Sequence, residues 1–305
     1  MNTTRCRRLA GQVYTPVMTT LIRDQSAQDE GAPSCAAEVL RVGLVPYLNA
    51  WPVCWGLQQL SNWRTSPTVP SALAGQFEAG EIDLSLGSSI DAMRLDPQPV
   101  VLPVSPIASE GSTLTVRIVS QVDPVDIQAL HCDTDSHTSV ALARILLQDE
   151  WGASPEIVPF DARSHVGDWP NSVLLIGDKV ITDASSEAHW PVQIDLGEVW
   201  TRTTGLPFVY ALWMLRPEQV HRADSICAVL DRQRRANALR FDAMVARGAD
   251  AHGWPVALAR EYLSRHLSYR FDERHAQGLD LFVERCRAHG LVDAGRMLQV
   301  HDWQG

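Results

Sequence analysis

The sequence contains almost no lysine, and it lacks several motifs that mark common enzyme classes. Of its 26 basic residues only Lys179 is a lysine, so Schiff-base catalysis has a single candidate side chain. Neither G-x-G-x-x-G nor G-x-x-x-x-G-K-[ST] is present, which argues against a dinucleotide site and a P-loop. No G-x-S-x-G turn occurs either, so nothing indicates a hydrolase nucleophile.

Two further absences bear on the cellular compartment. No apolar run approaches the ~18 residues that span a bilayer, and no secretory apolar region of ~7–15 residues follows the arginines near the N-terminus. Cysteines are few and form no C-x-x-C pair, a pattern typical of free thiols in a reducing compartment. They are Cys6, Cys35, Cys54, Cys132, Cys227 and Cys286. We therefore expect a cytoplasmic protein.

Length and charge limit the partners. The chain has 305 residues, enough for one large or two modest domains, and 45% of them are hydrophobic. The formal net charge of −10 argues against nucleic acid and anionic membranes as partners. A small-molecule ligand remains, and both a monomer and a dimer are compatible with the sequence.

A strand followed by a helix provides the first candidate site. The pattern predicts a buried strand over Leu40–Val45 and a helix that begins near Pro52, where proline fits the first turn. The turn between them carries Asn49 at the end of the strand. Free backbone N–H groups at such a position bind anions and small molecules in α/β proteins.

The order of the predicted elements indicates two lobes with a cleft between them. Strands and helices alternate to about residue 115, a central α/β block follows, and the chain then returns and ends in helices. The predicted division is 39–115 with 205–305 in one lobe, and 116–204 in the other. Residues 1–38 are expected to be a disordered extension, because 24–33 are polar and without period.

A polar turn before a strong helix is the second candidate site. The turn 134–139 carries four hydroxyl groups at a helix N-terminus, where the helix dipole favours a carboxylate or phosphate. The alternative is an ordinary helix cap, which needs one hydroxyl. The four residues are Thr134, Ser136, Thr138 and Ser139.

The same turn is rich in potential metal ligands. They are His131, Cys132, Asp133, Asp135 and His137. Zinc sites usually add a second ligand cluster at a defined spacing, and the remaining histidines form none. We therefore predict no metal.

Three other features could line a cleft. Ser109 stands beside a carboxylate after the run Val100–Ile107, which contains two prolines and is expected to be an edge or irregular strand. Asp178 ends another predicted strand and is either a cleft residue or a turn residue. Aromatic residues such as Tyr210 could line a pocket, although a core role is the simpler reading.

Several of these stretches together resemble one known family, the chorismate dehydratases of the futalosine pathway of menaquinone biosynthesis. The resemblance spans about residues 40–292, and its motifs occur in the family's order. The quoted stretches are 46–52 (family pattern S-Y-L-N-A-x-P), 86–91 (V-P-S-I-E), 107–111 (I-A-S-D-G), 133–140 (D-T-S-S-R-T-S-V), 175–178 (L-I-G-D), 204–209 and 269–273.

The resemblance implies a fold and an activity. The implied fold is an α/β, type II periplasmic-binding-protein-like architecture of two lobes with an interlobe cleft. The implied reaction is a hydro-lyase step without a cofactor, the elimination of water from chorismate to give 3-[(1-carboxyvinyl)oxy]benzoate. Because the product is aromatic, the enzyme mainly has to position its substrate.

The resemblance also implies roles for individual residues. Asn49 is expected to be catalytic, its amide orienting the enolpyruvyl carboxylate of the substrate, which itself takes the proton. Ser109 and the helix start at Thr138 and Ser139 are expected to hold carboxylates from opposite lobes. The complete set of expected substrate-binding residues is Tyr47, Ser89, Ser109, Ser136, Thr138, Ser139 and Asp178.

Four positions depart from the family pattern. Pro46 and Thr115 both stand where serine is usual, and Ser88 replaces a proline. His137 replaces an arginine, which removes a permanent cation near the predicted cleft.

Two alternatives stay open at this stage. One is a solute-binding protein of the same fold for a carboxylate ligand, which would need an export signal that the sequence does not show. The other is the related 1,4-dihydroxy-6-naphthoate synthase, whose first turn differs from Tyr47-Leu48-Asn49.

Overall fold

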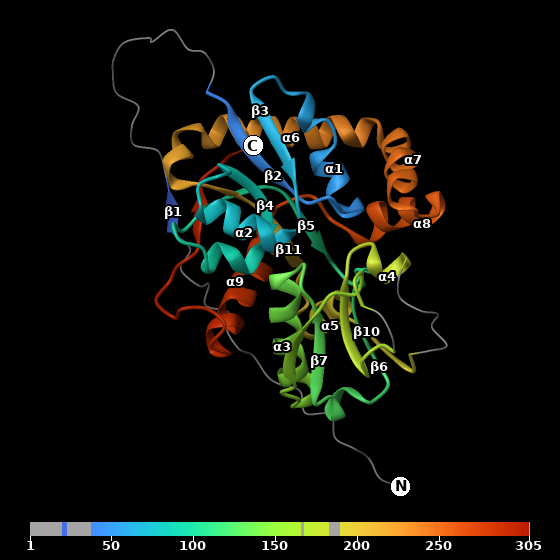
Figure 1. The fold of residues 1–305 in the computed structure, drawn as a ribbon. Coiled ribbons are helices and arrows are strands. Elements are labelled where there is room, and N and C mark those ends of the chain that lie inside the picture. The colour runs from blue at the N-terminus through green and yellow to red at the C-terminus, as the bar shows by residue number, and fades with distance from the viewer. Residues whose placement is uncertain (1–19, 23–37, 166–167, 183–189, 305) are drawn as a thin grey trace, which may run out of the picture.

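The strands of this protein form two separate sheets (Figure 1). The computed structural model describes residues 20–22, 38–165, 168–182 and 190–304. Within them the larger sheet has, in spatial order, the strands β1 (Thr20–Ile22), β12 (Gln299–His301), β5 (Val100–Ser109), β11 (Phe208–Leu215), β4 (Leu84–Ser88), β2 (Leu40–Leu44) and β3 (Trp63–Pro67). The smaller sheet has β10 (Val192–Asp195), β6 (Val116–Ser120), β9 (Ser172–Ile176), β7 (Ala129–Asp133) and β8 (Glu156–Phe160).

Helices cover both sheets. We call the larger sheet and its helices the first lobe, and the smaller sheet and its helices the second lobe. Helices of the first lobe are α1 (Trp51–Cys54), α2 (Pro70–Glu78), α6 (Ala223–Leu239), α7 (Phe241–His252), α8 (Val256–Glu261) and α9 (Glu273–Ala288). Those of the second lobe are α3 (His137–Trp151), α4 (Lys179–Thr182) and α5 (Leu196–Thr204).

The chain crosses between the lobes twice. It leaves the first lobe after β5 and returns after α5, so residues 110–115 and 205–207 are the two connections. The division into domains at residues 115/116 and 204/205 stays a prediction. Of the expected extension 1–38, residues 20–22 form β1, which pairs in parallel with β12; the segment 24–33 lies outside the described residues.

Strand β5 is irregular but lies inside its sheet, so the expected irregularity is confirmed and an edge position is wrong. It lies between β12 and β11, and its register against β11 shifts twice. Pro103 and Pro106 lack the N–H groups that a regular ladder needs. Ser105 has a φ of 44°, and its carbonyl accepts a hydrogen bond from Trp213 Nε1 at 3.2 Å. The Ser105 carbonyl therefore keeps a hydrogen-bond partner, although the bulge takes it out of the ladder between β5 and β11.

The turn after β2 is held in place from outside the sheet. Gly43 allows α2 to approach, since a Cβ there would lie 2.4 Å from Leu73 Cδ2. The expected helix from Pro52 ends early, because Gly56 adopts a φ of 94°. The Asn237 amide donates to the Pro52 and Trp55 carbonyls at 3.2 and 2.9 Å. These contacts fix the segment that carries Asn49 into the site.

Candidate functional site

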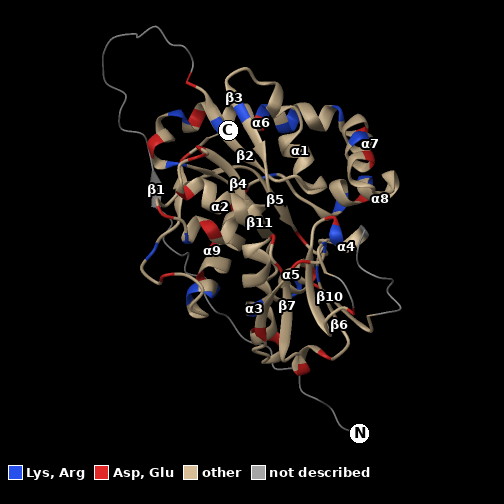
Figure 2. Cartoon of the chain, in the orientation of Figure 1, with Lys and Arg blue, Asp and Glu red and all other residues tan. Residues whose placement is uncertain are grey.

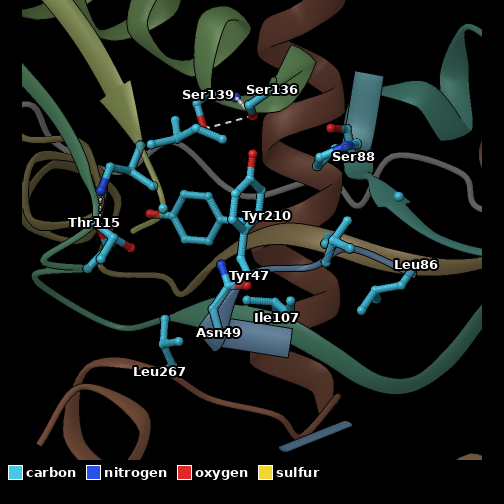
Figure 3. A pocket seen from close by; sticks show the side chains of 18 of the residues that line it. Tyr47, Asn49, Leu86, Ser88, Ile107, Thr115, Ser136, Ser139, Tyr210 and Leu267 are labelled. Atoms are coloured by element: carbon cyan, nitrogen blue, oxygen red, sulfur yellow. Dashed lines mark hydrogen bonds between the residues drawn. The ribbon is translucent and has the colours of Figure 1, made fainter. Parts of the chain in front are cut away.

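A cavity lies between the lobes, at the strand ends predicted to bind a ligand. Its cavity volume, the space open to the centres of water-sized molecules, is about 60 Å³. Figure 3 shows Asn49 on one side of it and Ser136 and Ser139 on the other. The polar residues that line it are Tyr47, Asn49, Ser88, Thr113, Thr115, Ser136, Ser139, Tyr210 and Tyr262. We call this space the interlobe cavity.

Tyr47 reaches from the first lobe into the second. Its ring lies against the backbone of Gly177, where a Cβ would be 3.3 Å from Tyr47 Cδ1. Its hydroxyl donates to Asp135 Oδ2 at 2.6 Å. Burial, followed by this hydrogen bond, raises the pKa of Tyr47 well above its ordinary value. Tyr47 is therefore a neutral wall of the cavity that also ties the lobes together.

Ser136 and Ser139 lie opposite, at the start of α3. Ser136 is the N-cap, and its Oγ accepts from the Ser139 backbone N–H at 3.1 Å and donates to Ser139 Oγ at 3.0 Å. The helix has 15 residues, so its dipole favours negative charge at this end. The cavity is thus suited to a carboxylate on this side.

Charged residues are spread over the helices and loops of both lobes (Figure 2). Among the described residues, none of those that line the interlobe cavity is Lys, Arg, His, Asp, Glu or Cys. The titratable groups there are tyrosines, and burial raises the pKa of both Tyr210 and Tyr262. The walls therefore supply hydrogen bonds but no general base that is effective near neutral pH.

The only lysine lies directly behind this wall. Lys179 Nζ is 2.6 Å from the Asp133 carboxylate and 2.7 Å from Asp135 Oδ2, and its side chain is 2% exposed. Burial raises the pKa of Asp133, and the Lys179 ammonium opposes that shift. Burial also acts to raise the pKa of Asp135, but hydrogen bonds from Lys179 and Tyr47 outweigh it and lower that pKa. Together, Lys179, Asp133 and Asp135 form a buried cluster. In it the Asp135 carboxylate, which accepts the hydrogen bond from Tyr47, keeps its charged form.

Two of the expected substrate-binding residues, Ser89 and Thr138, support the cavity from behind rather than line it. The hydroxyl of Ser89 donates to the Val209 and Tyr210 carbonyls at 2.5 and 3.1 Å. Thr138 Oγ1 accepts from the Ile90 N–H at 3.3 Å and lies 3.4 Å from Ser89 Oγ. Both side chains are fully buried, so they join α3 to the first lobe.

Ser109 and Asp178 also lie outside the lining. Ser109 is buried, with its hydroxyl 3.4 Å from the Tyr210 hydroxyl, so it contacts a lining residue. Asp178 contacts His252 of α7, with its Oδ2 atom 2.7 Å from Nδ1. Of the expected set, Tyr47, Asn49, Ser136 and Ser139 are the residues that the structure brings together around the cavity.

His137, which stands where the family has arginine, does not line the cavity. Its Nδ1 lies 2.9 Å from the carboxylate of Asp91, which belongs to the short 3₁₀ turn Ser89–Met93 of the first lobe. The hydrogen bond to Asp91 raises the pKa of His137, against the effects of burial and of Arg94. The change from arginine therefore alters a contact between the lobes instead of the charge inside the cavity.

This pair predicts a small pH dependence of stability. The folded pKa of His137 is raised, so its contribution is fully present below about pH 6.5 and is lost as pH rises through the folded pKa. The side chain is 36% exposed, and we expect an effect below about 1 kcal/mol. Unfolding by urea at pH 6 and pH 8 measures it. The free energy of unfolding of His137→Arg should reach or exceed that of the wild type at pH 8 but not at pH 6. A difference between the two proteins that does not change with pH would contradict this assignment.

The metal hypothesis gains no support from the geometry. Within the described ranges, no group of three or more His, Cys, Asp and Glu side chains is placed to hold a metal ion. The cysteines that the structure describes, Cys54, Cys132, Cys227 and Cys286, are buried free thiols. None of the helices in the described part of the chain combines the length and apolar character that a bilayer span requires.

Tyr262 and Thr113 were not expected in the site. Tyr262 belongs to the π-helical turn Tyr262–His266 in the last part of the first lobe, and Thr113 lies in the first connection between the lobes. Tyr210 lines the cavity, whereas Trp213 of the same strand, β11, is a core residue. No local pattern distinguishes these tyrosines from core aromatics, because what brings them here is packing between distant segments.

Two sheets of this order, joined by two connections around a polar cavity, define a protein of the periplasmic-binding-protein fold, and the predicted fold class is confirmed. A solved structure of a protein from Archaeoglobus fulgidus is similar with a TM-score of 0.70 and 14% identity, over 85% of this chain and 100% of that one. The periplasmic aliphatic sulphonate binding protein SsuA from Escherichia coli is similar with a TM-score of 0.58 and 15% identity, over 86% and 96%. At these identities the likeness concerns the fold.

The family is shown by sequence. A family model described as menaquinone biosynthesis matches residues 40–288, and the chain belongs to that family. A curated relative, chorismate dehydratase from Thermus thermophilus, is 28% identical over 257 residues, which covers 80% of this chain and 93% of the relative.

Proposed function

We propose that this protein is a chorismate dehydratase, which eliminates water from chorismate to give 3-[(1-carboxyvinyl)oxy]benzoate. Its family and the Thermus relative support this activity over the two alternatives, a solute-binding protein and 1,4-dihydroxy-6-naphthoate synthase. The structural observation that carries the proposal is the uncharged cavity built around Asn49.

An uncharged cavity suits an elimination in which the substrate supplies its own base. Chorismate brings two carboxylates, and the described lining contains no side chain able to take a proton near pH 7. The enolpyruvyl carboxylate is then the available acceptor. Exclusion of bulk water raises its basicity, because a carboxylate removed from water favours its neutral form.

The walls would hold the substrate in the reactive geometry. Ser136, Ser139 and the N-terminus of α3 favour one carboxylate on the second-lobe side. Asn49 faces the substrate from the first lobe. Positioning of this kind accounts for a large part of the rate when the reacting groups belong to one molecule.

The test is to incubate the purified protein with chorismate and follow the aromatic product by absorbance and mass. We expect catalytic conversion, many product molecules per protein molecule. Thermal stabilisation by chorismate without turnover would favour the solute-binding alternative and overturn the proposal. Boiled protein controls for the slow spontaneous reactions of chorismate.

A further inference from the structure

The 3₁₀ turn Leu48–Ala50, which carries Asn49, is tied to the second lobe at both of its ends. Tyr47 is the residue before the turn, and Trp51 is the residue after it. The Tyr47 hydroxyl donates to a carboxylate of the second lobe at 2.6 Å. Trp51 reaches the second lobe through one other side chain, that of His252.

His252 lies between Trp51 and Asp178, at the end of α7. Trp51 Nε1 is 3.0 Å from His252 Nε2, and His252 Nδ1 is 2.7 Å from Asp178 Oδ2. An indole N–H can only donate, so Nε2 of the imidazole is an acceptor and carries no proton. The proton of the neutral ring is then on Nδ1, where it is donated to the carboxylate. These partners assign one tautomer, and in it the ring links the two lobes.

Helix α7 also packs directly on the turn. Gly248 makes this approach possible, because a Cβ there would lie 2.8 Å from Leu48 Cδ1 and 3.2 Å from Trp51 Cδ2. Leu48 shares a small core with buried residues of α7, and Ile181 of α4 packs against that core from the second lobe. The second lobe therefore bears on the turn through packing as well as through hydrogen bonds.

The second-lobe end of the link belongs to the wall of the interlobe cavity. Gly177, the residue before Asp178, lines the cavity and lies against the Tyr47 ring. Lys179, the residue after it, binds the carboxylate that accepts from Tyr47. The residues two positions before and two positions after Asn49 therefore both lead to the same segment of the second lobe, 177–179.

The interlobe cavity is too small to admit a substrate while these contacts are in place. Its volume of about 60 Å³ is well below the roughly 300 Å³ or more of sites for small molecules. The lobes therefore have to part for chorismate to enter, and the contacts between them form again around it. Closure of this kind completes the arrangement of catalytic groups in many enzymes.

We propose that His252 is a positioning residue for the dehydratase reaction: it transmits closure of the lobes from Asp178 to Trp51 and so fixes the turn between the lobes. Asn49 then meets the substrate in one orientation once the lobes have closed. This rests on the proposed function and deepens it. It also gives Asp178 a role through another residue, in place of the direct substrate contact expected from the sequence. His252 does not line the cavity, so it acts without touching the substrate.

The test compares three substitutions at the link. His252→Leu removes both hydrogen bonds and should lower kcat about tenfold or more, because a misplaced catalytic group costs rate. His252→Gln offers one acceptor and one donor on a planar group and should recover most of that rate. Trp51→Phe keeps an aromatic ring and removes the N–H, so it should slow the enzyme to a similar extent. It decides the question if His252→Leu does not fold.

His289 provides the matched control, because it too joins the lobes through an aspartate. Its Nε2 lies 2.9 Å from Asp149 Oδ1, at the contact between the end of α9 and α3. His289→Leu breaks this contact away from the cavity and should leave kcat unchanged. An equal fall of kcat in His289→Leu and His252→Leu would overturn the inference, since any lost contact between the lobes would then slow the enzyme. Melting temperatures well above the assay temperature show that each variant is folded.

A double variant distinguishes positioning from direct binding by Asp178. Asp178→Ala should lower kcat by the same factor as His252→Leu, and the double variant should lose no more than either, because both residues act through one link. Losses that multiply would mean that Asp178 contacts the substrate itself, and the inference would be wrong. It would also be wrong if His252→Gln were as slow as His252→Leu, since the hydrogen bonds would then not matter.

Wild-type turnover is measured first, because it separates the two proposals. A wild type that does not convert chorismate overturns the proposed function and this inference with it. A wild type that converts chorismate, together with an unaltered His252→Leu enzyme, overturns the inference alone.

Discussion

Asn49→Ala is expected to lower kcat by about 100- to 1000-fold, the loss typical when one preorganised polar group of an active site is removed. The reason is its position: Asn49 is the only amide side chain among the described residues that line the cavity, and its buried oxygen accepts no hydrogen bond from any of the residues that the structure describes. Steady-state kinetics with chorismate measures the loss.

The fold should survive this substitution. Asn49 is half-buried in a short 3₁₀ turn, and alanine fits the same backbone conformation. Asn62→Ala is the matched control, since it truncates the same side chain on the first lobe away from the cavity and should retain full activity. An Asn49→Ala protein that turns over chorismate at the wild-type rate would refute the role of Asn49. Circular dichroism and the melting temperature check that loss of activity is not loss of structure.

Local sequence patterns predicted the elements and half of the expected site. Polar turns follow Leu40–Leu44 in the larger sheet and Ala129–Asp133 in the smaller sheet. Each was expected to face a ligand, because α/β proteins bind ligands at the carboxyl ends of their strands. Tyr47, Asn49 and Ser136 do line the interlobe cavity, and their roles toward a substrate stay predictions. The same reasoning works for any chain with this alternation, since it needs only the order of the elements.

Which residue of a turn faces the cavity could not be predicted. Ser88 lines it while Ser89 points into the first lobe, and Ser139 lines it while Thr138 bonds to Ser89. Adjacent residues at the end of a strand or in the first turn of a helix point in different directions, and the choice depends on the residue at which the element begins or ends, which the sequence pattern does not specify.

Tyr262 was missed for a different reason. Tyr262 meets Thr115 across 147 residues of chain, and it does so through the packing of the C-terminal helices on the first lobe. A buried tyrosine that lines a cavity and one that fills a core have the same local sequence signature. Only the assembled fold separates them.

The second large effect concerns the only lysine. Lys179→Met should lower the free energy of unfolding by about 3–5 kcal/mol, because removing one member of a buried ion pair leaves the others uncompensated. Asp133 is buried, Asp135 is nearly so, and both lie within 2.7 Å of Lys179 Nζ. Arg163 lies 3.7 Å from Asp135 and is half-exposed, so it compensates weakly. Denaturant unfolding at pH 7.5 measures the loss.

The control for Lys179→Met is the double variant Lys179→Met with Asp133→Asn. Asparagine keeps the acceptor for the Asp135 backbone N–H, which lies 3.0 Å from Asp133 Oδ1, and removes one buried charge. We expect it to recover about half of the lost free energy, since an unpaired charge costs more than a buried polar group.

Lower pH should also recover part of the free energy of unfolding that the single variant Lys179→Met loses. Burial already raises the pKa of Asp133, and loss of the ammonium raises it further, so the folded state binds a proton more readily than the unfolded state. The difference from the wild type should therefore shrink between pH 7.5 and pH 5. A loss that stays constant over this range, or a double variant no more stable than the single one, would mean that Lys179 stabilises the fold by packing and not by charge.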